Sequence, residues 1–262
     1  SSPTDITVTI GNGTTREREY VDLANPVDDD PREKRYRYSL FQPFCHVTLR
    51  ATLPRDFLVF TSLNVKWSAI RLYPGSLLEA QHPFGLTDGL ATIVSGGILY
   101  DTRRPEADPK SGLFAELSGR VNPPLPRGSG TFGGVFASLR GYVSLKPWLV
   151  LAGRLMGEML FGEIPFYEMV HWGGSAPVAG FGGSETLRGV AFGRWRAPGK
   201  AILNTEARFR LFSHKVFRRP LVWQAALIAD AGMVFGAGSE TTGPQGGFQI
   251  HPGLGGGIRA IY

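Results

Sequence analysis

The sequence predicts an all-β fold in which antiparallel strands form a transmembrane β-barrel. Three observations lead to this fold class. Nine segments alternate between apolar and polar residues, the period-two pattern of strands whose faces meet different surroundings. The polar faces carry charges of both signs at mid-strand positions, as expected of a hydrated lumen. Short and long connections alternate between the segments, which is typical of transmembrane barrels.

The alternation is clearest in residues 203–212. Leu203 and Phe209 share one face of this segment, while Glu206 and Arg208 share the other. Each segment is about ten residues long, enough for a tilted strand to cross the hydrocarbon core. The other eight segments are 46–53, 57–69, 92–103, 113–121, 135–144, 149–159, 221–235 and 253–262.

The connections predict two unlike rims for the barrel. Aromatic residues near the strand ends, such as Trp67, Trp148 and Trp223, match the girdles found at membrane interfaces. The alternative is a soluble all-β protein in which these residues form an ordinary core. The short connections are 54–56, 146–147 and 213–220, with 103–111 of intermediate length; the long ones are 74–89, 122–131, 161–199 and 236–247.

The chain divides into residues 1–34, an irregular segment, loop or hairpin, and residues 35–262, the barrel region. Within the first part, Gly11-Asn12-Gly13 is a strong hairpin signal, with 17–23 as the returning strand. Near Pro43 the alternation slips, which predicts a bulge or a sheet edge. Nine to eleven strands is an unusual count for an even-numbered barrel, so we expect further strands beyond this chain.

Composition argues against several classes of function. The net charge is +6, but the basic residues are scattered singly along strands rather than clustered with aromatics, so no nucleic-acid partner is expected. The one cysteine, Cys45, allows neither an intrachain disulfide nor a Cys-rich zinc site. The five histidines lack metal-ligand spacing, and Ser184 lacks the flanks of a nucleophile elbow. We therefore expect no metal, no cofactor, no catalytic residues and no enzymatic activity.

Three motifs follow one another along the chain. They are Gly-Ile-Leu-Tyr-Asp-Thr-Arg at 97–103, Gly-Gly-Ser at 182–184 followed by Leu-Arg-Gly-Val at 187–190, and Ile-Ala-Asp-Ala-Gly at 228–232. In their order and spacing, residues 55–262 resemble the outer-membrane assembly-factor superfamily. This family of bacterial surface antigen barrels includes BamA, TamA, the mitochondrial sorting-and-assembly barrel and the two-partner secretion transporters.

The resemblance implies a partial view of a sixteen-stranded barrel, integral to the outer membrane of a Gram-negative-type bacterium. The final two strands, the first several and any POTRA domains would lie outside this chain. The implied function is BamA-like assistance in the insertion and assembly of outer-membrane proteins. Alternatives are a polypeptide secretion pore, or a structural barrel that anchors a partner lipoprotein or a passenger. The implied partners are the lipid bilayer, client outer-membrane proteins or a secreted polypeptide, and lipoprotein or periplasmic subunits.

The resemblance also implies that loop 160–199 folds into the barrel and carries a motif formed by Leu187, Arg188, Gly189 and Val190. The planar guanidinium of Arg188 suits carboxylates in a confined site. Asp230 and Glu206 have lumen-facing parity on neighbouring strands, so we expect Arg188 to pair with Asp230 near Glu206. Val190 stands where the family has an aromatic residue, and Phe192 is a candidate to fill that space. The alternative for Arg188 is an exposed position in the loop.

Overall fold

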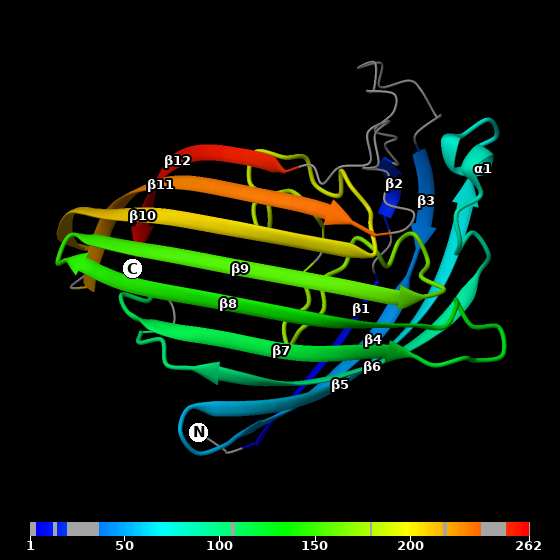
Figure 1. Ribbon diagram of the computed structural model, residues 1–262, viewed down its shortest axis with the longest axis horizontal. Coiled ribbons are helices and arrows are strands. Elements are labelled where there is room, and N and C mark those ends of the chain that lie inside the picture. Colours follow the sequence, from blue (N-terminus) through cyan, green and yellow to red (C-terminus); the bar gives the residue numbers. More distant parts are fainter. Residues whose placement is uncertain are drawn as a thin grey trace.

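The computed structural model describes residues 4–12, 15–19, 37–105, 108–178, 180–216, 219–236 and 250–261. These residues form twelve strands and one short helix, α1 (Leu77–Gln81), with Ser76 as its N-cap. The strands join in one curved antiparallel sheet (Figure 1). The predicted all-β antiparallel barrel fold is confirmed. In the part of the chain that the structure describes, β1 and β12 are not paired, so the sheet is a partial barrel.

The strands follow one another around the sheet in chain order from β4 onward. Their bounds are β1 Thr4–Asn12, β2 Thr15–Glu19, β3 Arg37–Phe41, β4 Pro43–Thr52, β5 Phe57–Leu72, β6 Gly89–Asp101, β7 Gly112–Asn122, β8 Phe132–Lys146, β9 Leu149–Gly162, β10 Gly199–Val216, β11 Arg219–Phe235 and β12 His251–Ile261.

The first two strands differ from the expected hairpin. β1 pairs with β4 and β2 pairs with β3, so both run in the same direction along one edge of the sheet. The chain therefore continues past Gly11 and Asn12 instead of reversing, because β3 and β4 offer a continuous row of backbone partners. Gly13 lies outside the described residues. The irregularity expected near Pro43 falls at Gln42, where β3 ends and β4 begins.

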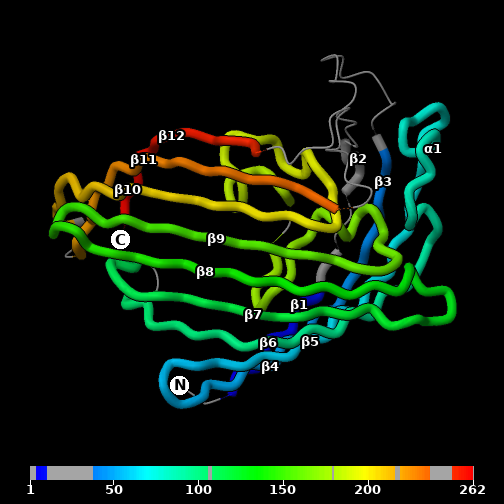
Figure 2. Tube along the Cα trace, in the orientation of Figure 1, coloured from blue at the N-terminus to red at the C-terminus, as the bar shows by residue number. Residues whose placement is uncertain are grey.

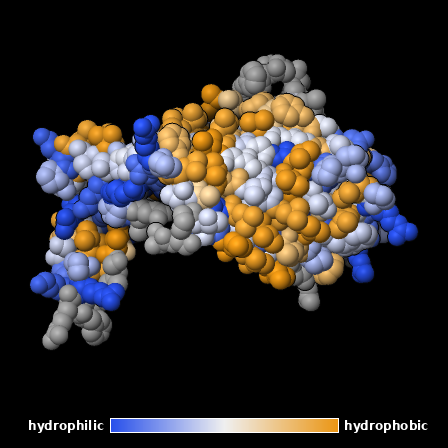
Figure 3. All heavy atoms as spheres, turned by 90° about the horizontal axis from the view of Figure 1, so that it is seen from below, coloured by the Kyte–Doolittle hydropathy of each residue, from blue (hydrophilic) through white to orange (hydrophobic). Residues whose placement is uncertain are grey.

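The two faces of the wall are as unlike as the sequence predicts. On the convex face Leu117, Leu139 and Leu227 are 56%, 47% and 62% exposed. Their chain neighbours Ser118 and Ser138 point inward and are buried. Figure 3 shows hydrophobic residues spread over the outer surface, with hydrophilic residues gathered toward its ends. An outward apolar surface of this kind suits contact with lipid.

Short turns lie at one end of the strands and long connections at the other (Figure 1). At the short-turn end, β10 and β11 extend to Val216 and Arg219, so the turn expected at 213–220 is shorter than predicted. A bulge between Arg210 and Phe212 shifts the alternation there and places Phe212 opposite Trp223.

The long connection between β9 and β10 lies on the concave side of the sheet (Figure 2). It comprises residues 163–198 and has little regular secondary structure. None of the helices in the described ranges is long and apolar enough to span a membrane.

Candidate functional site: the loop inside the barrel

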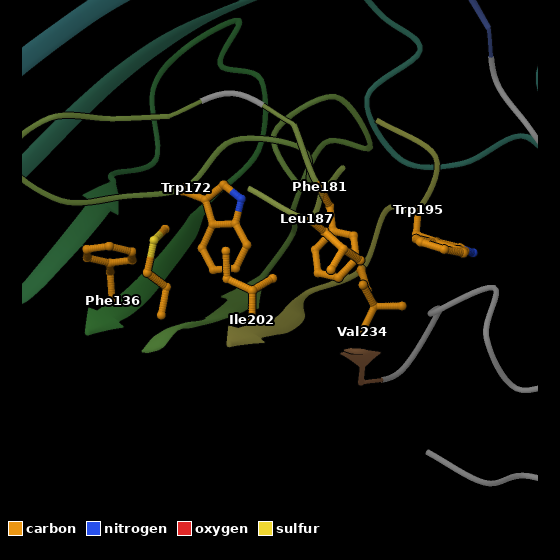
Figure 4. Close-up of a cluster of buried hydrophobic side chains, with 9 residues drawn as sticks. Phe136, Trp172, Phe181, Leu187, Trp195, Ile202 and Val234 are labelled. Atoms are coloured by element: carbon orange, nitrogen blue, oxygen red, sulfur yellow. The ribbon is translucent and has the colours of Figure 1, made fainter. Parts of the chain in front are cut away.

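The inward loop, defined as residues 163–198, packs against the lumen wall through a hydrophobic cluster. Trp172 and Phe181 of the loop stack with ring centroids 6.2 Å apart, and both are fully buried. Figure 4 shows these rings close to wall residues such as Phe136 and Ile202. The cluster comprises Phe136, Met156, Trp172, Phe181, Leu187, Trp195, Ala197, Ile202 and Val234. Protein therefore fills this part of the lumen.

Arg188 lies in the second half of the inward loop and contacts both expected carboxylates. Its Nε and Nη2 donate to Oδ2 and Oδ1 of Asp230 at 2.7 and 2.6 Å, and its Nη1 donates to Oε1 of Glu206. The backbone N–H of Arg188 also donates to Asp230 Oδ2 at 3.0 Å. Hydrogen bonds to Asp230 raise the pKa of Arg188; burial opposes this and Glu206 adds to it. The guanidinium fork thus bridges β10 and β11.

Two glycines of the wall allow the inward loop to come close to β11 and β12. Gly232 shares the lumen face with Asp230, and a Cβ there would lie 2.8 Å from Phe181 and 2.9 Å from Leu187. On β12, a Cβ at Gly253 would overlap the carbonyl oxygen of Arg188. The Asp-x-Gly strand therefore supplies a charge for the arginine and space for the leucine before it.

The last two residues of the motif have different surroundings. Gly189 has φ +87°, a conformation that side-chain-bearing residues rarely adopt. Val190 is partly buried against the hydrophobic cluster of the loop. Phe192 is 58% exposed and lies over Gly180 and Gly183. Phe192 is therefore not part of the hydrophobic cluster and lies at the surface of the loop.

Glu206 connects the arginine to the short-turn end of the barrel. Its Oε2 accepts from Arg208 Nε at 2.8 Å. Arg208 also lies 3.8 Å from Asp108, and Asp108 accepts a hydrogen bond from Gln224 at 3.0 Å. Asp108 belongs to the β6–β7 connection, which was expected at residues 103–111 as a turn of intermediate length. These contacts place Asp108 on the inner side of β10 and β11.

A second ionic cluster holds the first half of the inward loop. Glu158 of β9 is 2.8 Å from both Lys200 Nζ and Arg120 Nη2. Lys200 Nζ also donates to the carbonyls of Met169 and His171 at 2.7 Å, and Glu158 accepts from the Gly173 N–H at 2.9 Å. Because Glu158 and Lys200 are almost fully buried, this cluster joins the wall and loop in a site shielded from water.

Glu168 provides another contact between the loop and the wall. It is fully buried and lies 2.5 Å from Lys66 Nζ on β5. Burial alone would raise the pKa of Glu168, but the charges of Lys66, His171 and Arg120 outweigh it, so the pKa lies below its ordinary value. The carboxylate therefore stays ionised at neutral pH although it is buried.

A cavity of about 450 Å³ remains between the loop and strands β1, β4, β5, β6 and β7. Most of the residues that line it have polar or charged side chains, among them His46, Arg50, Asn64, Lys66 and Arg120. Among the residues that the structure describes, no group of histidine, cysteine and carboxylate side chains is arranged to hold a metal ion.

The Glu158–Lys200–Arg120 cluster was not expected from the sequence. One signal was available: Phe136, Ile202 and Val234 are large apolar residues at lumen-facing positions, as expected where a wall carries packed protein instead of water. Lys200 was overlooked because it stands where the loop ends and β10 begins, before the alternation becomes clear.

Comparison with known proteins agrees with this geometry. The model of the Omp85 superfamily domain matches residues 46–262. The structure is similar to the crystal structure of BamA from Haemophilus ducreyi lacking POTRA domains 1–3, with 14% sequence identity and a TM-score of 0.53. The similarity covers 88% of this chain and 57% of that one, so this chain spans little more than half of that structure. No curated protein sequence matches the chain. The chain belongs to the Omp85 superfamily and forms an integral β-barrel of the outer membrane of a Gram-negative-type bacterium.

Proposed function

We propose that this chain is the barrel of a BamA-type factor that assists the insertion and assembly of other outer-membrane proteins. One observation carries the proposal: an arginine in a loop inside an Omp85 barrel binds Asp230 and Glu206 on two adjacent strands. The contact joins the loop to the wall near the middle of the lumen. We propose Leu187, Arg188, Gly189 and Val190 as the functional motif, with Asp230 and Glu206 as its partners.

In this proposal, clients are handled by the wall and the bilayer. The loop fills much of the lumen, so a client strand would pair with an exposed sheet edge, where backbone hydrogen bonds accept any sequence. The partners would be unfolded outer-membrane proteins, with lipoprotein or periplasmic subunits that deliver them. The charged residues of the lumen would hold the loop and perform no catalysis. The proposed function requires neither enzymatic activity nor a cofactor.

A reconstitution assay tests this function. The native full-length protein is inserted into lipid vesicles, and the folding rate of an unfolded outer-membrane client is compared with that in empty vesicles. We expect faster folding with the wild type and a substantial loss with Arg188→Ala. Arg71→Ala serves as the control, because it removes an exposed arginine at the end of β5 where the long connections lie. Equal rates with and without the wild-type protein would exclude an insertion function.

The polar cavity beside the loop favours a second candidate, a polypeptide secretion pore. If the loop moved, this cavity would widen into a passage lined by groups that can bind a polypeptide backbone. Depletion of the protein in cells separates the two candidates. An insertion factor should lower the amounts of other outer-membrane barrels, whereas a pore should stop export of one substrate and leave those amounts unchanged.

A further inference from the structure

The described charged residues are distributed unequally between the two rims. At the long-loop rim the exposed Arg71 and Arg127 are balanced by the exposed Glu79, Asp88 and Glu163. At the short-turn rim the exposed carboxylates are Asp5 and Asp56, and Asp56 is paired with Arg104 at 3.0 Å. Six further exposed cations stand at this rim: Arg55, Lys110, Lys146, Arg210, Lys215 and Arg219. Among the described residues, cations therefore outnumber carboxylates strongly at the short-turn rim.

The β10–β11 hairpin carries this charge beyond the rest of the wall. β9 begins opposite Phe209, whereas β10 continues to Val216. On the other side, the pairing of β11 with β12 ends at Val222. On its β9 side the end of the hairpin therefore extends beyond the neighbouring strand.

One face of the hairpin end is suited to a membrane interface. Phe212 and Trp223 stack with ring centroids 6.0 Å apart and continue the lipid-facing side of the wall. Trp148, half exposed at the neighbouring turn, stacks on Phe209 at 6.2 Å. Lys215 lies on the hairpin beyond these rings. Aromatic rings at the depth of the lipid headgroups, followed outward by cations, match the chemistry of a phospholipid interface.

We propose that the short-turn rim, centred on the β10–β11 hairpin, binds anionic phospholipids of the inner leaflet and enriches them around this side of the barrel. The aromatic rings would pack at the level of the glycerol groups, and the cations, Lys146 and Lys215 among them, would bind the phosphates. Each basic residue near an anionic membrane surface favours binding about five-fold, so several together select anionic over zwitterionic lipid. This proposal does not depend on which client or substrate the barrel handles.

Tryptophan quenching by brominated lipid tests the proposal. In a Trp67→Phe background of the full chain, Trp148 and Trp223 report on lipid at this rim, while Trp172 and Trp195 are buried in the lumen. The protein is reconstituted in mixtures of phosphatidylglycerol and phosphatidylcholine in which one lipid or the other is brominated. We expect phosphatidylglycerol to quench more strongly than its mole fraction predicts.

The charge variant is the double substitution Lys146→Gln with Lys215→Gln, matched by Arg71→Gln with Arg127→Gln at the other rim. The first pair should lower the relative binding constant for phosphatidylglycerol by roughly 25-fold, while the second pair should leave it unchanged. The temperature-dependent gel shift of the barrel verifies that both variants are folded. Equal quenching by the two lipids in the wild type, or equal losses in both double variants, would overturn the proposal; the first result would favour an acidic protein partner for this rim.

Discussion

Replacing Arg188 with alanine should release the second half of the inward loop. The guanidinium donates three charge-assisted hydrogen bonds, two to Asp230 and one to Glu206. The Asp230 side chain is fully buried, so the variant would leave a buried carboxylate with the Arg188 backbone N–H and the Asn204 side chain as its partners. Removing one partner of a buried pair costs roughly 3–5 kcal/mol. Because the Arg188 side chain is 24% exposed, we expect about 3 kcal/mol, near the lower end of that range.

A loss of about 3 kcal/mol corresponds to roughly a hundred-fold shift between the docked and undocked loop. Hydrogen–deuterium exchange in bilayer-reconstituted protein measures this shift directly, because protection of the 181–196 amides reports the local opening free energy. Exchange of the wall strands should change far less. The control is Arg71→Ala, which changes an exposed residue near the C-terminal end of β5 and should leave hydrogen exchange in the loop unaltered.

Arg188→Lys refines the same experiment. Lysine keeps the charge but lacks the planar fork that reaches both carboxylates at once, so we expect loop exchange between those of the wild type and the alanine variant. Unchanged loop protection and unchanged heat stability in both variants would refute the pairing as an anchor of the loop.

Three further predictions concern other contacts of the loop. Gly253→Ala should displace the loop and lower heat stability, because its Cβ would overlap the loop backbone, whereas Gly255→Ala, with open space around it, should not. Glu168 has a depressed pKa in the folded state, so the stability it contributes is present above the ordinary value of 4.5 and is lost as the pH falls below it. Hydrogen exchange in the first half of the inward loop should therefore rise on acidification. Glu168→Gln should remove this pH-dependent component. Lys200→Met should lower the free energy of unfolding in urea by roughly 3–5 kcal/mol, and adding Glu158→Gln should restore part of the loss; additive losses would contradict a coupled pair.

The strands of the barrel wall could be predicted because the environment of each residue depends on its position within its own strand. Each residue of a lipid-facing strand meets either hydrocarbon or the lumen, so alternation in residues 203–212 or 113–121 identifies both the strand and its faces. Bulges were harder to place, because the insertion of Leu211 changes parity without changing composition. The pairing of Arg188 with its carboxylates followed from the motif order of the family, while the residues alone left an exposed arginine as an alternative.

The lumen interior could not be predicted in the same way. Its contacts join residues far apart in sequence, such as Lys66 with Glu168 and Asp108 with Gln224, and no short-range pattern specifies them. The hairpin predicted for the N-terminal strands was wrong for a related reason. A Gly-Asn-Gly sequence favours a tight hairpin locally, but an unpaired strand edge elsewhere in the sheet offered the same backbone hydrogen bonds without a reversal.

Spin labels on neighbouring residues test the central claim most directly, namely that lipid covers the outer face of this wall while the inward loop covers the inner face. Labels replacing Leu117 and Leu139 should collide freely with oxygen dissolved in the bilayer. Ser118 follows Leu117 in the sequence, and Ser138 precedes Leu139. Labels replacing these two serines should be shielded from both oxygen and a water-soluble relaxation agent. Ready access of the water-soluble agent to the serine positions, or no difference between neighbours, would contradict the account.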